Sequence, residues 1–167
     1  MAEPNTASLP TRQVLLQRLF LKDCSLEVPL APQVFSRQWN PTIDVQINSN
    51  ISGIGEQLFQ VVLAVTVTAK LGEEIGFLAE VHQAGIFHVS GFESEAEVQG
   101  VLGGYCPNVI FPFAREAIAE LTQRGSFPPV LLQPINFEGL YMEHVNKQRG
   151  QSAEISASGD GSNVVLQ

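Results

Sequence analysis

The residues of this chain whose side chains could support nucleophilic catalysis are Cys106 and the three histidines. Cys106 stands beside Pro107 near the start of a predicted helix, a position that favours the thiolate form of a cysteine. A free cysteine is nevertheless among the most commonly buried residue types. We therefore interpret Cys106 as a structural core residue, and an enzyme that uses Cys106 with one of the histidines is the alternative hypothesis.

The sequence lacks the spacing that metal and phosphate sites require. Zinc sites need closely spaced ligands such as CxxC or HExxH, whereas the cysteines and histidines are scattered: Cys24, His82, His88, Cys106 and His144. Neither GxxxxGK(S/T) nor GxGxxG occurs, so an ATP-driven cycle is not expected. We predict no cofactor, no metal and no enzymatic activity.

Aromatic side chains supply the candidates for a binding surface. Six of them fall at loop or element ends: Phe35, Trp39, Tyr105, Phe127, Phe137 and Tyr141. They concentrate around the segment 126–136 (SFPPVLLQPIN), which prolines keep out of a helix and which is apolar, Leu131 included, although loops are normally polar. The alternative is that these aromatic side chains belong to the hydrophobic core. Their concentration favours a groove lined by aromatic and apolar side chains.

Composition and charge limit the possible partners. The net charge of −8 argues against a nucleic-acid binder and favours a partner of basic character. Charged residues make up only 16% of the chain, which is typical of a surface partly covered by further copies. With only two cysteines, the chain lacks the disulfide framework that is typical of small secreted proteins. With no signal peptide or membrane-spanning run recognised, we expect a soluble cytoplasmic protein.

The element that must position these residues is a long antiparallel hairpin over 58–89. Its first arm alternates apolar residues from Phe59 to Ala69, and its second arm alternates Phe77, Ala79, Val81 and Gln83 with more polar neighbours. Before it, we predict a strand ended by Pro29 and Pro32, in which a helix over 14–20 is the alternative. A second strand around 43–48 and a turn over 48–55 follow.

After the hairpin the pattern becomes helical. A short helix is predicted over 93–102, and a longer one begins with Asn108 as its cap, tolerates Pro112 only near its first turn and ends at Gly125. A last helix begins at the cap Asn136 and ends at Gly150. We expect disorder in 1–11, a single domain in 12–149 and a disordered tail in 150–167.

The order of elements predicts an α+β fold, a four-stranded antiparallel sheet with helices packed on one face. Residues two apart in a strand share a face of the sheet. If the first strand returns beside the fourth, as in a Greek key, four side chains would therefore meet on one side of the sheet: Asp23, Glu27, Leu78 and Glu80.

Several segments resemble the SecB family of bacterial protein-export chaperones, over roughly 15–145. The sharpest are YCPNVIFPFARE (105–116) and GSFPP (125–129). KDCSLE (22–27), LGEE (71–74), FLAEV (77–81) and PINF (134–137) also fit. Phe20, Leu26 and Phe113 depart from the usual residues of the family, where Tyr, Phe and Tyr are common.

The resemblance implies a holdase that needs no ATP, keeps secretory preproteins unfolded and delivers them to the SecA motor. It implies a homotetramer, a dimer of dimers, without nucleic-acid binding or membrane insertion. Asp23, Glu27, Leu78 and Glu80 would bind the zinc-bearing tail of SecA, and Phe77, Ala79, Val81 and Gln83 would face the subunit interior and form the tetramer-side face of the sheet. The preprotein groove would use Phe35, Trp39, Tyr105, Phe127, Leu131, Phe137 and Tyr141. The alternative is a SecB-like chaperone dedicated to one client, such as an antitoxin.

Overall fold

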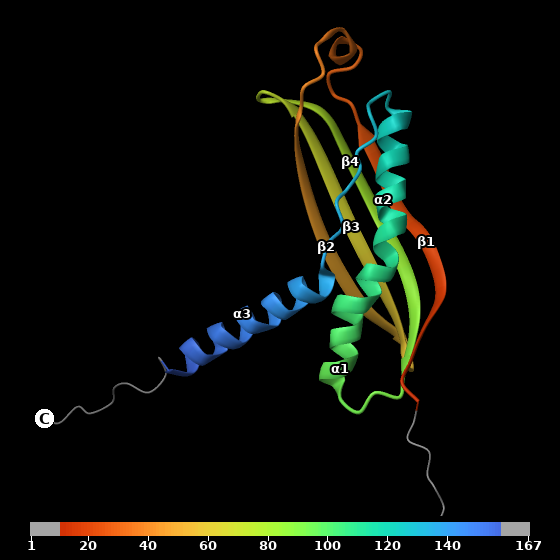
Figure 1. Ribbon diagram of the computed structural model, residues 1–167, viewed down its shortest axis with the longest axis vertical. Helices are drawn as coiled ribbons and strands as arrows, with labels where there is room; N and C mark the ends of the chain where they lie inside the picture. The colour runs from red at the N-terminus through yellow and green to blue at the C-terminus, as the bar shows by residue number, and fades with distance from the viewer. Residues whose placement is uncertain (1–10, 158–167) are drawn as a thin grey trace, which may run out of the picture.

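The computed structural model describes residues 11–157 of the 167-residue chain (Figure 1). The disorder expected for 1–10 and for 158–167 lies outside the described residues. The elements follow in this order: β1 (Gln13–Glu27), a 3-10 turn η1 (Gln33–Ser36), β2 (Thr42–Gly55), β3 (Leu58–Leu71), β4 (Glu74–Ser90), α1 (Glu95–Gly100), a π-helical segment η2 (Val101–Tyr105), α2 (Cys106–Arg124) and α3 (Phe137–Ala157).

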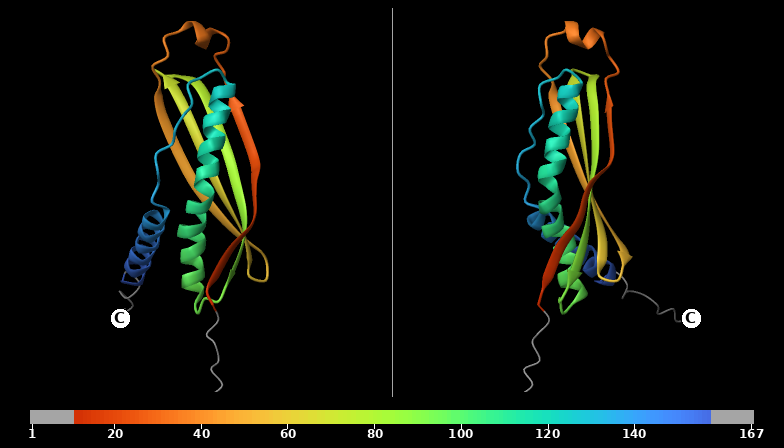
Figure 2. Two further views of the ribbon diagram at one scale, coloured as in Figure 1. Left: turned by 45° about the vertical axis from the view of Figure 1, so that its right-hand side comes forward. Right: turned by 90° about the vertical axis from the view of Figure 1, so that its right-hand side faces the viewer.

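The four strands form one antiparallel sheet in the order β1-β4-β3-β2. The predicted hairpin is β3 and β4, and β1 returns beside β4, which confirms the Greek-key arrangement. The helix considered over 14–20 is absent, and β1 is a strand throughout with bulges between Leu16 and Arg18 and between Leu21 and Asp23. α2 runs along one face of the twisted sheet (Figure 2).

The turn predicted over 48–55 is wrong. β2 continues to Gly55, and the chain reverses at Glu56 and Gln57, where Gln57 has a φ of 58°. Asn48 pairs with Ala64 and Asn50 with Val62. The apolar residues of β3 therefore hold this polar stretch in a ladder that its own turn propensity does not favour.

Alternation along β3 and β4 produces the two faces of the sheet. Phe77, Ala79 and Val81 are at most 1% exposed and pack with apolar residues of α2, among them Ile110 and Ile118. We call this the inner face. The side chains between them along β4 lie on the opposite, outer face, as the period of two in a strand requires.

α1, η2 and α2 follow one another without a break, so the prediction that Asn108 caps a helix is wrong. Ser94 is the cap, and its hydroxyl accepts a hydrogen bond from the Glu97 N–H. Pro112 lies inside α2 rather than near the helix start. It removes the donor to the carbonyl of Asn108, and Asn108 is exposed, so water can satisfy that carbonyl. Gly125 ends α2 as predicted.

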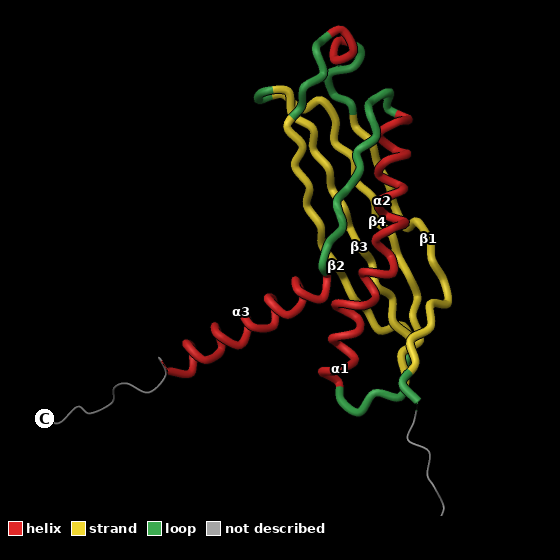
Figure 3. The backbone as a smooth tube through the Cα atoms, viewed as in Figure 1, coloured by secondary structure: helices red, strands yellow, loops and turns green. Residues whose placement is uncertain are grey.

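The segment 126–136 is extended and contains no helix or strand, as predicted, and it runs beside α2 (Figures 1 and 3). The Thr122 hydroxyl anchors it, since it accepts a hydrogen bond from the Val130 N–H at 3.1 Å. Thr122 is completely buried on α2 and donates its own proton to the Ile118 carbonyl at 3.0 Å. One side chain therefore fixes the segment to the helix.

α3 begins as predicted, because Asn136 Oδ1 accepts a hydrogen bond from the Gly139 N–H at 3.0 Å. The prediction that Gly150 ends it is wrong, since the helix continues to Ala157 and takes in the first part of the predicted tail. A glycine within a helix costs only about 1 kcal/mol, and Gly150 lacks the turn geometry that would stop the chain. α3 packs on η2 and projects beyond the sheet (Figure 1).

Candidate peptide groove and docking face

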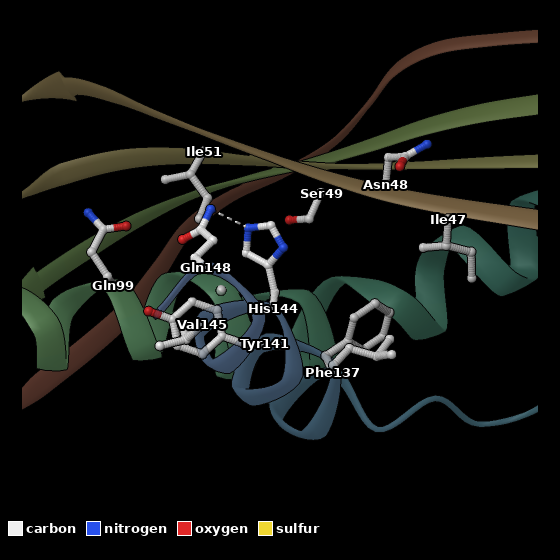
Figure 4. Close-up of a pocket in the computed structure, with 12 residues that line it drawn as sticks. Ile47, Asn48, Ser49, Ile51, Gln99, Phe137, Tyr141, His144, Val145 and Gln148 are labelled. Atoms are coloured by element: carbon white, nitrogen blue, oxygen red, sulfur yellow. Dashed lines mark hydrogen bonds between the residues drawn. The ribbon is translucent and has the colours of Figure 1, made fainter. Parts of the chain in front are cut away.

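A hollow of about 690 Å³ lies between the inner face of β2 and the first turns of α3 (Figure 4). Ile47 and Ile51 point into it from β2, and Phe137 and Tyr141 approach from α3. Tyr141 reaches this position because Gly103 of η2 has no side chain. A Cβ on residue 103 would lie 2.3 Å from Tyr141 Cδ2. The glycine pair 103–104 therefore determines how closely α3 approaches the sheet.

A second hollow of about 380 Å³ shares Ile47 with the first and continues along β2 beneath the segment 126–136. Ile43 and Val45 of β2 line it together with residues 130–135. These side chains are open to solvent, with Ile43 41%, Val45 40% and Leu131 62% exposed. We call the two hollows together the β2 groove. It is a mostly apolar, open channel between an edge strand and the segment that joins α2 to α3.

Polar groups gather at the α3 end of the β2 groove. Ser49 of β2, Gln99 of α1 and His144 of α3 all line it, and His144 Nε2 lies 2.9 Å from Gln148 Nε2 (Figure 4). The groove therefore offers aliphatic and aromatic surface along most of its length and hydrogen-bonding groups at one end. Such a surface suits an extended polypeptide of varied sequence.

Only three of the seven predicted groove residues line the β2 groove. Leu131 lies beside β2, while Phe137 and Tyr141 lie near α3, although Phe137 is only 5% exposed and is also core. Tyr105 lines a separate hollow of about 390 Å³, which it shares with Arg12 and Tyr141.

The other three predicted groove residues form an aromatic cluster at the far end of the sheet. The ring of Phe127 lies 4.7 Å from that of Trp39, 5.5 Å from that of Phe35 and 4.9 Å from that of Phe77. Phe127 is buried, whereas Phe35 is 53% exposed. This cluster joins the loop between β1 and β2 to the end of α2. It continues the apolar surface without lining the β2 groove.

The β2 side of the groove was not among the predicted site residues. Ile43, Val45 and Ile47 form one half of its wall. Their alternation with polar residues predicts a strand. The same alternation carried a further signal, because an edge strand with a row of apolar side chains needs a partner on that face.

The four residues predicted to share a face do so. β1 and β4 pair Glu27 with Leu78, Ser25 with Glu80 and Asp23 with His82, and directly opposite residues point to the same side of a sheet. We call the surface made by Asp23, Glu27, Leu78 and Glu80 the docking face. It lies on the outer face, opposite the face that α2 covers.

Glu80 is held in place by two neighbours on the outer face. The Thr66 hydroxyl lies 3.1 Å from its Oε2, and His82 Nε2 lies 2.9 Å from its Oε1. The side chains of His82 and Glu80 are 32% and 40% exposed, so the pair is open to a partner. Beside it, a hollow of about 360 Å³ is lined by Lys22, His82 and the neighbouring polar and apolar residues of β2 and β3.

Cys106 does not have the environment of a nucleophile. It is completely buried in the core, and burial raises the pKa of its thiol to about 12. The thiolate that a nucleophile requires is therefore scarce at neutral pH. Within residues 11–157, no three His, Cys, Asp or Glu side chains come close enough together to hold a metal ion.

Comparison with known proteins assigns this architecture to a family. The family model for preprotein translocase subunit SecB matches residues 7–148. The protein-export protein SecB of Methylococcus capsulatus is 46% identical over 152 residues, which are 91% of this chain and 96% of that protein. The chain belongs to the SecB family. It is therefore a protein-export chaperone, and SecB is a family of chaperones rather than of enzymes.

A similar fold is found in a solved structure. A SecB-like chaperone from Mycobacterium tuberculosis, in complex with a ChAD peptide from an antitoxin, has a TM-score of 0.61. The match covers 73% of this chain and 90% of that one, at 18% sequence identity. It supports the four-stranded α+β fold.

The residues predicted to face the subunit interior lie on the inner face of the sheet, which α2 of the same chain covers. Phe77, Ala79, Val81 and Gln83 are each 5% exposed or less within a single chain. They cannot contact another subunit directly. They support the helix layer, and any assembly must use side chains that remain exposed.

No helix within residues 11–157 has both the length and the hydropathy needed to cross a membrane.

Proposed function

We propose that this SecB-family protein is an ATP-independent holdase that keeps secretory preproteins unfolded and binds them along the β2 groove. The observation that carries the proposal is the continuity of the two hollows through Ile47. An extended chain can lie along both hollows, with apolar side chains against β2 and the segment 126–136. No ordered pocket of fixed shape is needed, so clients of different sequence can use the same channel.

The expected affinity of one groove is modest. Each Phe or Leu side chain that a client buries contributes about 1.5–3 kcal/mol, from which the cost of ordering the client is subtracted. Several grooves on one assembly would engage a long client together and raise the overall affinity without new contacts. A holdase of this kind releases short or folded chains readily.

Exposed apolar side chains support the proposed dimer of dimers. Leu16 and Leu21 of β1 pair with Phe87 and Gln83, so they belong to the inner face, and they are 40% and 49% exposed. Phe113 of α2 is 42% exposed. A second copy placed against β1 and α2 would cover this apolar surface, which a lone chain leaves in water.

The docking face is the proposed contact for SecA. Asp23, Glu27 and Glu80 supply negative charge toward its zinc-bearing tail, and Leu78 supplies apolar contact. The β2 groove opens on the inner side of the sheet and the docking face lies on the outer side, so client and motor could bind together. On this proposal the chaperone works in the bacterial cytoplasm, before translocation.

The client proposal is tested by the refolding of a slow-folding precursor. A near-stoichiometric amount of the assembled protein should delay refolding, and Leu131→Asp in the β2 groove should shorten that delay. Ile54→Asp is the matched control, since Ile54 is 51% exposed outside the groove. A wild-type protein that does not delay refolding contradicts the holdase. Capture of one dominant client from cells would instead favour the dedicated chaperone.

A further inference from the structure

We propose that His82 is a positioning residue for Glu80 and that its protonation makes docking of a basic partner depend on pH. The inference rests on the proposed docking function. It goes beyond it by assigning a role to His82, which is not one of the four docking residues.

The geometry around Glu80 differs from that around the other acidic residues of the docking face. Glu80 has a partner on each carboxylate oxygen, Thr66 on Oε2 and His82 on Oε1. Within the part of the chain that the structure describes, Asp23 and Glu27 make no side-chain hydrogen bond or ion pair. Glu80 is therefore the one acidic group there whose orientation is fixed before a partner arrives.

The ladder of β3 and β4 explains why these three side chains meet. Thr66 is directly opposite Glu80, and His82 follows Glu80 by two residues on the same strand. All three consequently point to the outer face. An ionised carboxylate only accepts hydrogen bonds, so His82 Nε2 must carry the proton that it shares with Glu80 Oε1. Fixing a glutamate during folding removes an entropy loss that binding would otherwise incur.

The sign of the pH effect follows from the charges around His82. A histidine gains its second proton between pH 5 and 8. When His82 is neutral, it orients Glu80 and leaves the full negative charge for a basic partner. When His82 is protonated, its positive charge offsets that of Glu80. Docking should therefore weaken as the pH falls through this range.

Every strand packed against His82 contributes to this balance. β1 places Asp23 opposite His82 and Lys22 beside the same hollow. β4 supplies Glu80. β3 and β2 supply only uncharged side chains there, among them Thr66, Asn48 and Asn50. The charged groups that face His82 are therefore two carboxylates and one ammonium.

Calorimetric titration with a synthetic zinc-loaded peptide of the SecA tail tests the inference on the full assembled protein. At pH 7.5, His82→Ala should raise Kd about fivefold, the value of one hydrogen bond, and His82→Gln should stay within about twofold of wild type because its amide donates without titrating. Between pH 7.5 and 6.0, the ratio of the wild-type Kd to the His82→Gln Kd should rise several-fold. This ratio cancels pH effects on the peptide itself.

The inference would be overturned if the ratio of the wild-type Kd to the His82→Gln Kd stayed constant between pH 7.5 and 6.0 and His82→Ala bound the peptide with wild-type affinity. Glu80→Gln separates the two proposals. If Glu80→Gln weakens binding and His82→Ala does not, only the role of His82 fails, whereas unchanged binding by Glu80→Gln contradicts the docking face itself. Proton–nitrogen NMR of the imidazole at pH 8 tests positioning without any partner. The Nε2–H form should dominate and decline in Glu80→Ala, and an unchanged population would also overturn the inference.

Discussion

Gly76 of β4 lies directly against the indole of Trp39. A Cβ on residue 76 would lie 2.9 Å from Trp39 Cζ3, a distance that real Cβ atoms do not adopt. The indole also packs on the ring of Phe127 at 4.7 Å and stacks on that of Phe77 at 5.9 Å. The absence of one side chain therefore allows the loop between β1 and β2 to close over the end of the sheet.

Gly76→Ala should displace Trp39 and lower the free energy of unfolding by about 1–3 kcal/mol, the usual cost of overpacking. Trp39 is the only tryptophan of the chain, so its fluorescence reports the displacement directly. Gly53→Ala in β2 is the control, because a Cβ there meets nothing within 4 Å. Equal thermal stability and equal emission spectra in the two variants would contradict this packing argument.

Gly103→Ala should loosen α3 from η2, because the new Cβ would overlap the Tyr141 ring. Hydrogen exchange should become faster in the first turns of α3, and client binding in the β2 groove should weaken. Gly100→Ala offers a control one turn earlier, since its Cβ would lie 3.9 Å from Tyr141, an ordinary contact. Unchanged exchange in Gly103→Ala would show that α3 is not positioned by the glycine pair.

Thr122→Val should destabilise the protein by about 1–3 kcal/mol, because the Val130 N–H would lose its hydrogen-bond acceptor. The shape of the side chain is nearly unchanged, so the loss reports the hydrogen bond rather than a cavity. Thr122→Ser keeps the hydroxyl and should recover most of the stability in denaturant unfolding. Faster hydrogen exchange confined to 126–136 in the valine variant would show that the anchor acts locally.

The sheet was the most predictable part of the molecule, because apolar residues recur at every second position over most of residues 58–90. Once β3 and β4 are paired, the faces of Phe77 and Glu80 follow from the period of two. The position of Asp23 and Glu27 on the outer face required one further assumption, the return of β1 beside β4. The register of β1 with β4 confirms that assumption, and two bulges interrupt the pairing.

In the wrong predictions, the local propensity of one residue is overridden by the structure around it. Asn48 and Asn50 favour turns, but pairing with β3 extends β2 through them. Asn108 is a good cap residue, but it continues a helix that Ser94 already started. The groove was only half identified, because Ile43 and Val45 meet the segment 126–136 across more than 80 residues of sequence, a contact that no local pattern reveals.

Cys106 gives a prediction of pH dependence. Its pKa of about 12 lies above that of an unfolded cysteine, so the native state keeps a proton that the unfolded state has lost. Stability must therefore fall as the pH rises from about 9 toward 12, by about 1.4 kcal/mol per pH unit at most. Cys106→Ala should flatten this part of the profile in denaturant titrations.

The same burial predicts selective alkylation in the native protein. Cys24 is exposed and Cys106 is buried. Iodoacetamide at pH 8 should therefore modify Cys24 first, and Cys106 should react only on unfolding. Mass spectrometry of peptides from the native protein distinguishes the two sites. Rapid native modification of Cys106, with loss of function, would revive the hypothesis of a reactive thiol.

Glu80→Lys should weaken SecA binding about tenfold or more and leave client binding unchanged, because the docking face and the β2 groove lie on opposite sides of the sheet. The change reverses the charge of the one acidic side chain that Thr66 and His82 hold in place. Glu73→Lys makes the same charge change at an exposed position in the turn between β3 and β4 and should bind SecA nearly as wild type does. Both affinities can be measured by calorimetry on the assembled protein. Loss of client and SecA binding together in Glu80→Lys would indicate misfolding or misassembly, and a check of oligomeric mass would identify it.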